Sequence, residues 1–143
     1  MVTELLDCIS AALYDKFGPG IEIYTNVVEM GSAENCFFLQ VLEPALTRYP
    51  NRRWRLEVPL DVHYFHGDGT DTTALYGIGE RALPLLEQLP NPGGLPFRGT
   101  GLRFQVDEGE RALHVFATYT LQLRDVEETE LMQILSQEVG LSG

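Results

Sequence analysis

The chain has 143 residues, of which 44% are hydrophobic and 22% charged, and its formal net charge is −11. This length and composition are typical of one soluble globular domain spanning residues 1–143, and they exclude a disordered chain and a membrane-spanning one. A single lysine and nine arginines among 21 acidic residues argue against specific nucleic-acid binding, because neutralising phosphates requires clustered Lys and Arg.

The first third of the chain predicts one helix and two short strands. Apolar residues recur at helical spacing from Thr3, which can cap the helix, to about Phe17, and Gly18-Pro19-Gly20 ends it. A strand is expected from Ile21 to Tyr24, and the apolar run from Cys36 to Leu42 predicts a buried strand. The two cysteines, Cys8 and Cys36, sit among apolar residues and are expected to be buried, reduced thiols.

Residues 52–65 alternate between apolar and polar side chains, which predicts a half-buried antiparallel strand. Trp54 and Leu56 point to one face, whereas Arg53 and Arg55 point to the other. Pro59 has no backbone N–H, so we expect this strand to lie at a sheet edge or to be bulged there.

The remaining elements are a helix, a hairpin and a final helix. Thr70 or Thr72 is expected to cap a helix that reaches Leu89, with Pro84 kinking or shortening it. Residues 97–106 and 112–124 predict a hairpin, and residues 127–139 a third, weaker helix. The element order is therefore α-β-β-β-α-β-β-α. We predict a single α+β domain, in which two helices pack on a mostly antiparallel or mixed sheet and a long hairpin protrudes.

Three motifs resemble functional sites, but the residues around each of them do not fit such a site. Residues 77–82 spell G-x-G-x-x-A, but these glycines fall within a predicted helix and not in a strand-to-helix turn. His63 and His66 are three apart on a strand and so point to opposite faces, and with His114 they supply no obvious third metal ligand. Residues 68–71 resemble a calcium loop that lacks its closing Glu. We therefore expect no catalytic, cofactor-binding or metal-binding residues, and no cofactor.

Four of the ten basic residues, Arg48, Arg52, Arg53 and Arg55, are packed around Trp54 in an otherwise acidic chain. They are either ordinary solvent-exposed residues at the start of a strand or a basic patch that meets an acidic patch on a neighbouring copy. Arg and Trp are enriched at interface hot spots, and a ring requires two different complementary patches on each subunit. We take these four arginines as the candidate oligomer interface.

The sequence resembles small tail terminator proteins of phages and prophages of Gram-positive bacteria. The resemblance extends over about residues 5–124 and rests on four stretches, which are Ala12–Gly18, Glu22–Phe38, Asp61–Phe65 and Phe97–Arg124. None of these stretches is a catalytic signature.

The resemblance implies a structural protein that assembles in the host bacterial cytoplasm and ends up at the head-proximal end of the virion tail. It also implies a ring, typically of six subunits, that caps the tail tube and joins it to the head. The partners would be other copies of the chain, the major tail tube protein and a head-completion protein. The alternatives are a head-completion or minor tail protein and, from another class, a small cytosolic enzyme or ligand-binding module. A deep pocket lined by converging polar groups would favour that last alternative.

Overall fold

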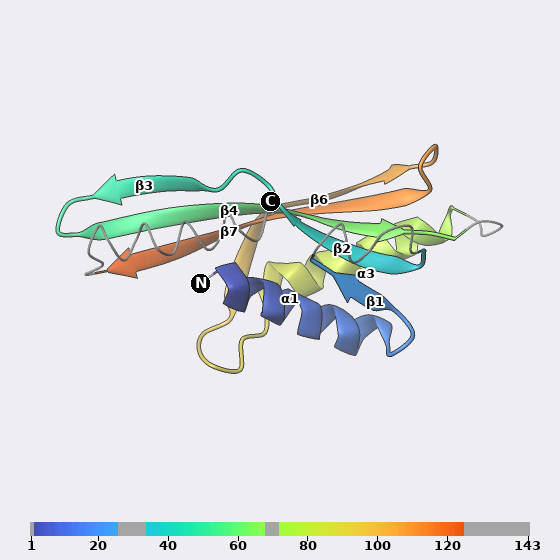
Figure 1. Cartoon of the computed structure of the whole chain (residues 1–143), viewed down its shortest axis with the longest axis horizontal. Helices are drawn as coiled ribbons and strands as arrows, with labels where there is room; N and C mark the ends of the chain where they lie inside the picture. The colour runs from blue at the N-terminus through green and yellow to red at the C-terminus, as the bar shows by residue number, and fades with distance from the viewer. Residues whose placement is uncertain (1, 26–33, 68–71, 125–143) are drawn as a thin grey trace.

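The computed structural model describes residues 2–25, 34–67 and 72–124. Its helices are α1 (Val2–Phe17) and α3 (Ala74–Glu87). Its strands are β1 (Glu22–Tyr24), β2 (Cys36–Val41), β3 (Ala45–Tyr49), β4 (Arg53–Phe65), β5 (Gln88–Leu89), β6 (Phe97–Asp107) and β7 (Ala112–Arg124). These elements confirm the predicted α+β fold (Figure 1).

All seven strands belong to one sheet, in the order β1-β2-β4-β7-β6-β5, with β3 also pairing to β4. Only β1 and β2 pair in parallel, so the sheet is mixed but mostly antiparallel. The predicted hairpin is β6–β7, and a bulge between Thr100 and Arg103 interrupts its register where Gly101 adopts a φ of 62°. A glycine accepts this conformation without a Cβ clash.

The long axis of the molecule is the pairing of β4 with β7, which is unbroken from Arg53↔Arg124 to Phe65↔Ala112. Both strands have 13 residues, so the ladder is about 40 Å long at roughly 3.3 Å per residue. On its other side β4 pairs first with β3 and then with β2. Strands β3, β4 and the end of β7 thus form a three-stranded extension that reaches beyond α1 and α3 (Figure 1).

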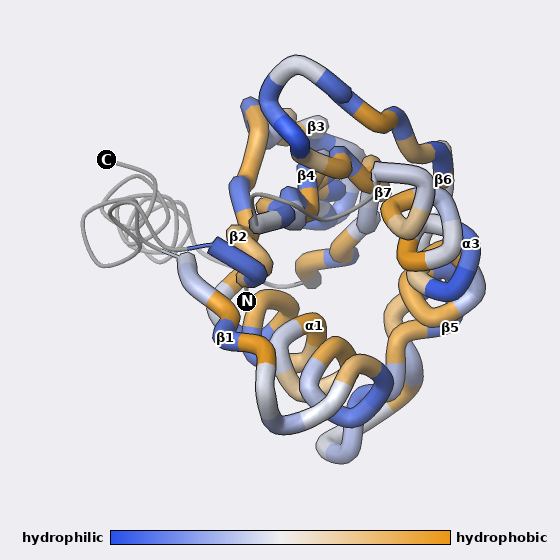
Figure 2. The backbone as a smooth tube through the Cα atoms, turned by 90° about the vertical axis from the view of Figure 1, so that its right-hand side faces the viewer, coloured by the Kyte–Doolittle hydropathy of each residue, from blue (hydrophilic) through white to orange (hydrophobic). Residues whose placement is uncertain are grey.

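The hydrophobic core lies between one face of the curled sheet and the two helices (Figure 2). Helix α1 buries the stripe predicted for it, including Leu5, Ile9 and Leu13. The sheet contributes alternate residues of β4 and β7, with Val58 and Val115 completely buried. Neither α1 nor α3 is long and apolar enough to cross a membrane.

The expectation that Pro59 marks an edge strand or a bulge was wrong. β4 is an inner strand, and its register with β7 continues unbroken through Pro59↔Thr118. The Pro59 carbonyl accepts a hydrogen bond of 2.8 Å from the Leu42 N–H, so the proline nitrogen faces the same neighbour. At this point β2 has just ended at Val41 and β3 starts at Ala45, so the missing N–H falls in the gap between two partner strands.

Three further expectations need correction. Thr3 does not cap the first helix, because α1 already begins at Val2. Thr73, and not Thr70 or Thr72, holds the N-cap position of α3 and makes no side-chain cap bond; Pro84 lies inside this helix, which ends at Glu87, before the expected Leu89. The chain also forms two strands that were not predicted, β3 and β5. The predicted third helix, residues 127–139, lies outside the described residues.

Candidate functional site

The four arginines of the candidate interface gather at the end of the extension, on and beside the turn between β3 and β4. Arg48 and Arg53 lie on the two strands, and Arg52 lies in the turn with a φ of 58°. Arg48, Arg52 and Arg53 are exposed, and Arg55 is half-buried. We call this group the basic tip.

The basic tip presents two faces. Arg48 stands opposite Trp54 in the register, and its guanidinium lies 5.3 Å from the centre of the Trp54 ring. Arg53 and Arg55 point to the other face, as the alternation predicts. There Arg55 lies 5.6 Å from the Tyr49 ring centre, and it forms an ion pair of 3.1 Å with Glu57. Stacking on aromatic rings restricts the positions of the Arg48 and Arg55 charges, and Glu57 balances only that of Arg55.

The opposite end of the β4–β7 ladder is acidic. The turn between β6 and β7 carries Asp107, Glu108 and Glu110, and both glutamates are exposed. Arg111, which ends this turn, donates a hydrogen bond of 3.2 Å to the Gly67 carbonyl. We call the three carboxylates the acidic turn. Figure 1 shows this turn and the basic tip at opposite ends of the molecule.

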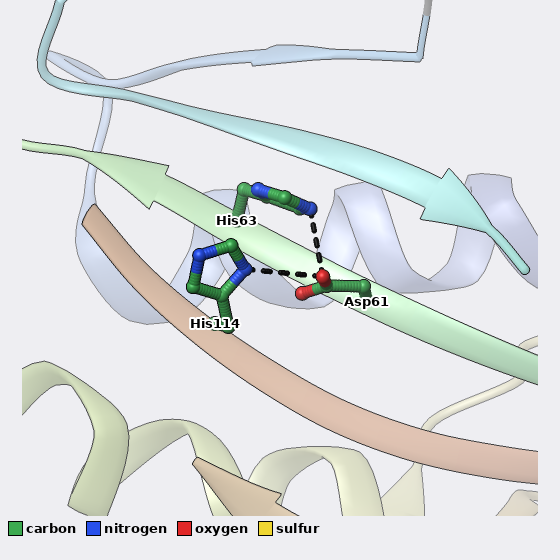
Figure 3. A network of polar contacts seen from close by, with 3 residues as sticks. All are labelled: Asp61, His63 and His114. Carbon is green, nitrogen blue, oxygen red and sulfur yellow. Dashed lines mark hydrogen bonds and ion pairs between the residues drawn. The ribbon is translucent and has the colours of Figure 1, made fainter. Parts of the chain in front are cut away.

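The structure also assembles a polar cluster that sequence reasoning missed. Asp61, His63 and His114 meet on the sheet face turned away from α1 and α3 (Figure 3). His63 and His114 stand directly opposite each other on β4 and β7. Asp61 Oδ2 lies 2.8 Å from His63 Nε2 and 3.1 Å from His114 Nδ1. The i, i+2 spacing of Asp61 and His63 could have shown that both lie on one face of a strand, whereas the place of His114 depended on strand register.

The other motifs lie where the sequence placed them or outside the described residues. Gly77 and Gly79 are inside α3, so no strand-to-helix turn surrounds them. The His66 ring packs near the core residue Tyr64, away from His63. The calcium-like stretch 68–71 lies outside the described residues. Cys36 is buried and Cys8 is half-buried, and the two are not joined in a disulfide; burial is the main cause that raises the pKa of each.

One surface pocket lies beside β5 and the start of β6, lined by Glu87, Gln88, Pro96, Phe97 and Arg98. Its lining contains one acidic and one basic side chain and no Ser, Cys or His. Nucleophilic catalysis requires a nucleophile within hydrogen-bond reach of a base, and this lining offers none of the usual pairs. The pocket therefore gives no support to the enzyme alternative.

Comparison with known proteins identifies one family. Residues 4–130 match a family model described as phage tail terminator protein. The match runs from α1 through the whole of β7, so it includes the basic tip, the acidic turn and the polar cluster. Among curated proteins no match was found.

Proposed function

Because the chain belongs to the phage tail terminator protein family, we propose that it caps the tail tube and joins tail to head as a ring of identical subunits. Membership of this family makes the chain a structural tail protein, and the family is not one of enzymes. The ring, its location at the head-proximal end, and the contacts with the major tail tube protein and a head-completion protein are our proposal. So are a ring of six, assembly in the host cytoplasm and a Gram-positive host.

The observation that carries the ring is the three-stranded extension. β3 pairs only with β4, and β7 pairs with β6 no further than Tyr119. Within the described part of the chain, both outer edges of the extension therefore lack a partner strand. Such edges are ready to pair with a strand from another chain. Both edges lie at the basic-tip end of the molecule, so a strand from a neighbouring copy that pairs with either edge would contact the extension beside the basic tip.

Charge gives the contact a direction. The basic tip and the acidic turn lie at opposite ends of a ladder about 40 Å long, so the acidic turn of a subunit cannot reach the basic tip of the same subunit. A head-to-tail arrangement brings the tip of one copy near the acidic turn of the next. Such heterologous contacts between different patches form a ring when the rotation closes. A two-fold dimer would instead use the same patch on both copies.

Binding to tube ends tests the proposed function. Purified tail tubes are mixed with the gold-labelled full chain and viewed by electron microscopy. We expect gold at one end of each tube, because a terminator recognises the finished end. Label along the tube wall, or none on tubes but label on isolated heads, would contradict tube capping. The second of these results would favour a head-completion protein.

A further inference from the structure

Two buried atoms of the polar cluster lack hydrogen bonds, Asp61 Oδ1 and His63 Nε2. Asp61 is only 6% exposed, on a sheet face where most neighbours are half-buried. Within the described residues its Oδ1 has no hydrogen-bond partner. A buried carboxylate oxygen without a partner is costly, so native structures compensate it with a proton, a donor or a cation.

His63 also has a buried polar atom without a hydrogen bond. Its Nε2 lies 2.8 Å from Asp61 Oδ2, yet this nitrogen also lacks a hydrogen bond of acceptable geometry. The two atoms are close, but an N–H on the ring would not point along the line that joins them. His114 Nδ1 approaches the same oxygen at 3.1 Å. Three potential ligand atoms therefore converge, and two of the three side chains carry an unsatisfied atom.

We propose that Asp61, His63 and His114 form a binding site for a divalent transition-metal ion, with Zn²⁺ as its representative. A cation accepts lone pairs from all three side chains at once, and so satisfies the atoms that hydrogen bonding leaves unpaired. Imidazole and carboxylate are ordinary zinc ligands, and three protein ligands leave a fourth position for water or for a group from a neighbouring molecule. This proposal replaces the expectation from sequence that no metal binds.

The distances suit a small ion. Zinc ligands at about 2.0–2.2 Å from the metal in a tetrahedron are about 3.3 Å apart. All three ligand atoms already lie within 4.8 Å of one another, and the two measured separations need to open by only a few tenths of an ångström. Rotation about the side-chain bonds supplies such a shift without moving β4 or β7.

The surroundings also suit a metal. His63 stacks on Phe65, and His114 stacks on Phe116, which limits the freedom of both rings. The ligands stand on the paired central strands of the sheet, so their backbones are held by the β4–β7 ladder. Ligands on rigid strands lose little entropy when an ion binds. The inference does not depend on ring formation.

A second group of potential metal ligands shares His114 with the proposed site. Asp107, Glu110 and His114 also place one ligand atom each within 4.8 Å of the others. Glu110 is exposed at the β6–β7 turn, and exposed carboxylates bind divalent ions weakly because water competes for them. The test must therefore separate the two sets, and His63 and Glu110 each belong to only one of them.

Zinc binding to the full chain at neutral pH is measured by titration calorimetry, and Co²⁺ is used in parallel because its visible spectrum reports a tetrahedral site. We expect one ion per chain, with affinity lowered at least about tenfold in His63→Gln and in Asp61→Asn, since even outer-shell changes typically lower metal affinity 10- to 100-fold. The matched controls His66→Gln and Glu110→Gln should bind as the unaltered chain does. Zinc should also raise the melting temperature of the unaltered chain and leave that of His63→Gln unchanged.

Two results would overturn the proposal. One is an unaltered chain that binds no zinc at neutral pH. The other is binding that survives His63→Gln but is lost in Glu110→Gln, which would place the ion at the turn. If the variants fail to fold, NMR of the histidine rings in the unaltered chain decides. Zinc should shift the signals of His63 and His114 but not those of His66.

Discussion

The Tyr119 hydroxyl donates a hydrogen bond of 2.7 Å to the Leu86 carbonyl oxygen, and so fastens β7 to the end of α3. In a longer helix this carbonyl would accept from the residue four positions on, which here is Pro90 and has no N–H. Gly99 stands opposite Tyr119 on β6, and a Cβ there would lie 2.5 Å from the same carbonyl. The bond therefore depends on a glycine that leaves room for it.

Replacing Tyr119 with Phe should lower the free energy of unfolding by about 1–3 kcal/mol, because a buried carbonyl then loses its donor. Both partners are almost completely buried, and burial also raises the pKa of Tyr119, so water cannot substitute. The matched control is Tyr14→Phe on the exposed face of α1, where the side chain is 52% exposed and the change should be near zero. Urea melts compare the two, and equal effects would contradict this assignment.

Two glycines of α3 should respond in opposite directions to substitution by Ala. A Cβ at Gly79 would stand 2.7 Å from the Cγ of Phe104, so the whole ring must move, whereas Gly77 has nothing within 4 Å. We expect Gly77→Ala to stabilise by up to about 1 kcal/mol through helix propensity. Gly79→Ala should destabilise, because overpacking typically costs about 1–3 kcal/mol. Thermal melting checks both, and stabilisation by Gly79→Ala would mean that the contact is loose.

A charge swap tests the direction of the subunit contact. Arg53→Glu with Arg55→Glu exchanges two of the four positive charges of the basic tip for negative ones, and Glu108→Arg with Glu110→Arg exchanges two of the three negative charges of the acidic turn for positive ones. Each double variant should weaken assembly, by about 0.2–1 kcal/mol for each lost ion pair and more strongly at low salt. Stability should change little, because these are largely surface positions. Ring formation or tube capping reports assembly, and melting reports the fold.

The four changes combined in one chain provide the control. At every joint the two new carboxylates then face the two new guanidinium groups, so the exchanged ion pairs form with reversed signs and assembly should recover part of the way toward the level of the unaltered chain. A combined variant that assembles no better than either double variant would show that tip and turn do not meet. Unchanged assembly of the tip variant at low salt would show that these arginines are only solvent-exposed residues at the start of a strand and have no role in assembly.

Sequence patterns predicted those elements whose apolar residues follow one period. The stripe of α1 and the alternation of β4 and β7 were visible because each buries one regular face. β3 was not, because most of its residues are exposed and only pairing with β4 makes it a strand. Pro59 was misread for a related reason, since a local pattern does not reveal where one partner strand gives way to another.

The polar cluster, too, could be predicted from the sequence only in part. Asp61 and His63 share a strand face, and that could be read from their spacing. His114 joins them only because its strand pairs in a register that sets it opposite His63. Strand register between segments about fifty residues apart depends on the packing of the whole sheet, which one sequence does not display.

The central claim is that the chain works by self-assembly, and its particle mass tests this most directly. Light scattering over rising protein concentration, with and without purified tail tubes, gives the mass of the free and the tube-bound species. We predict a species several times the chain mass of 16.0 kDa, either free or bound at tube ends. A free monomer alone is compatible with a ring that closes on its partner. A strict monomer that also ignores the tubes would contradict the claim.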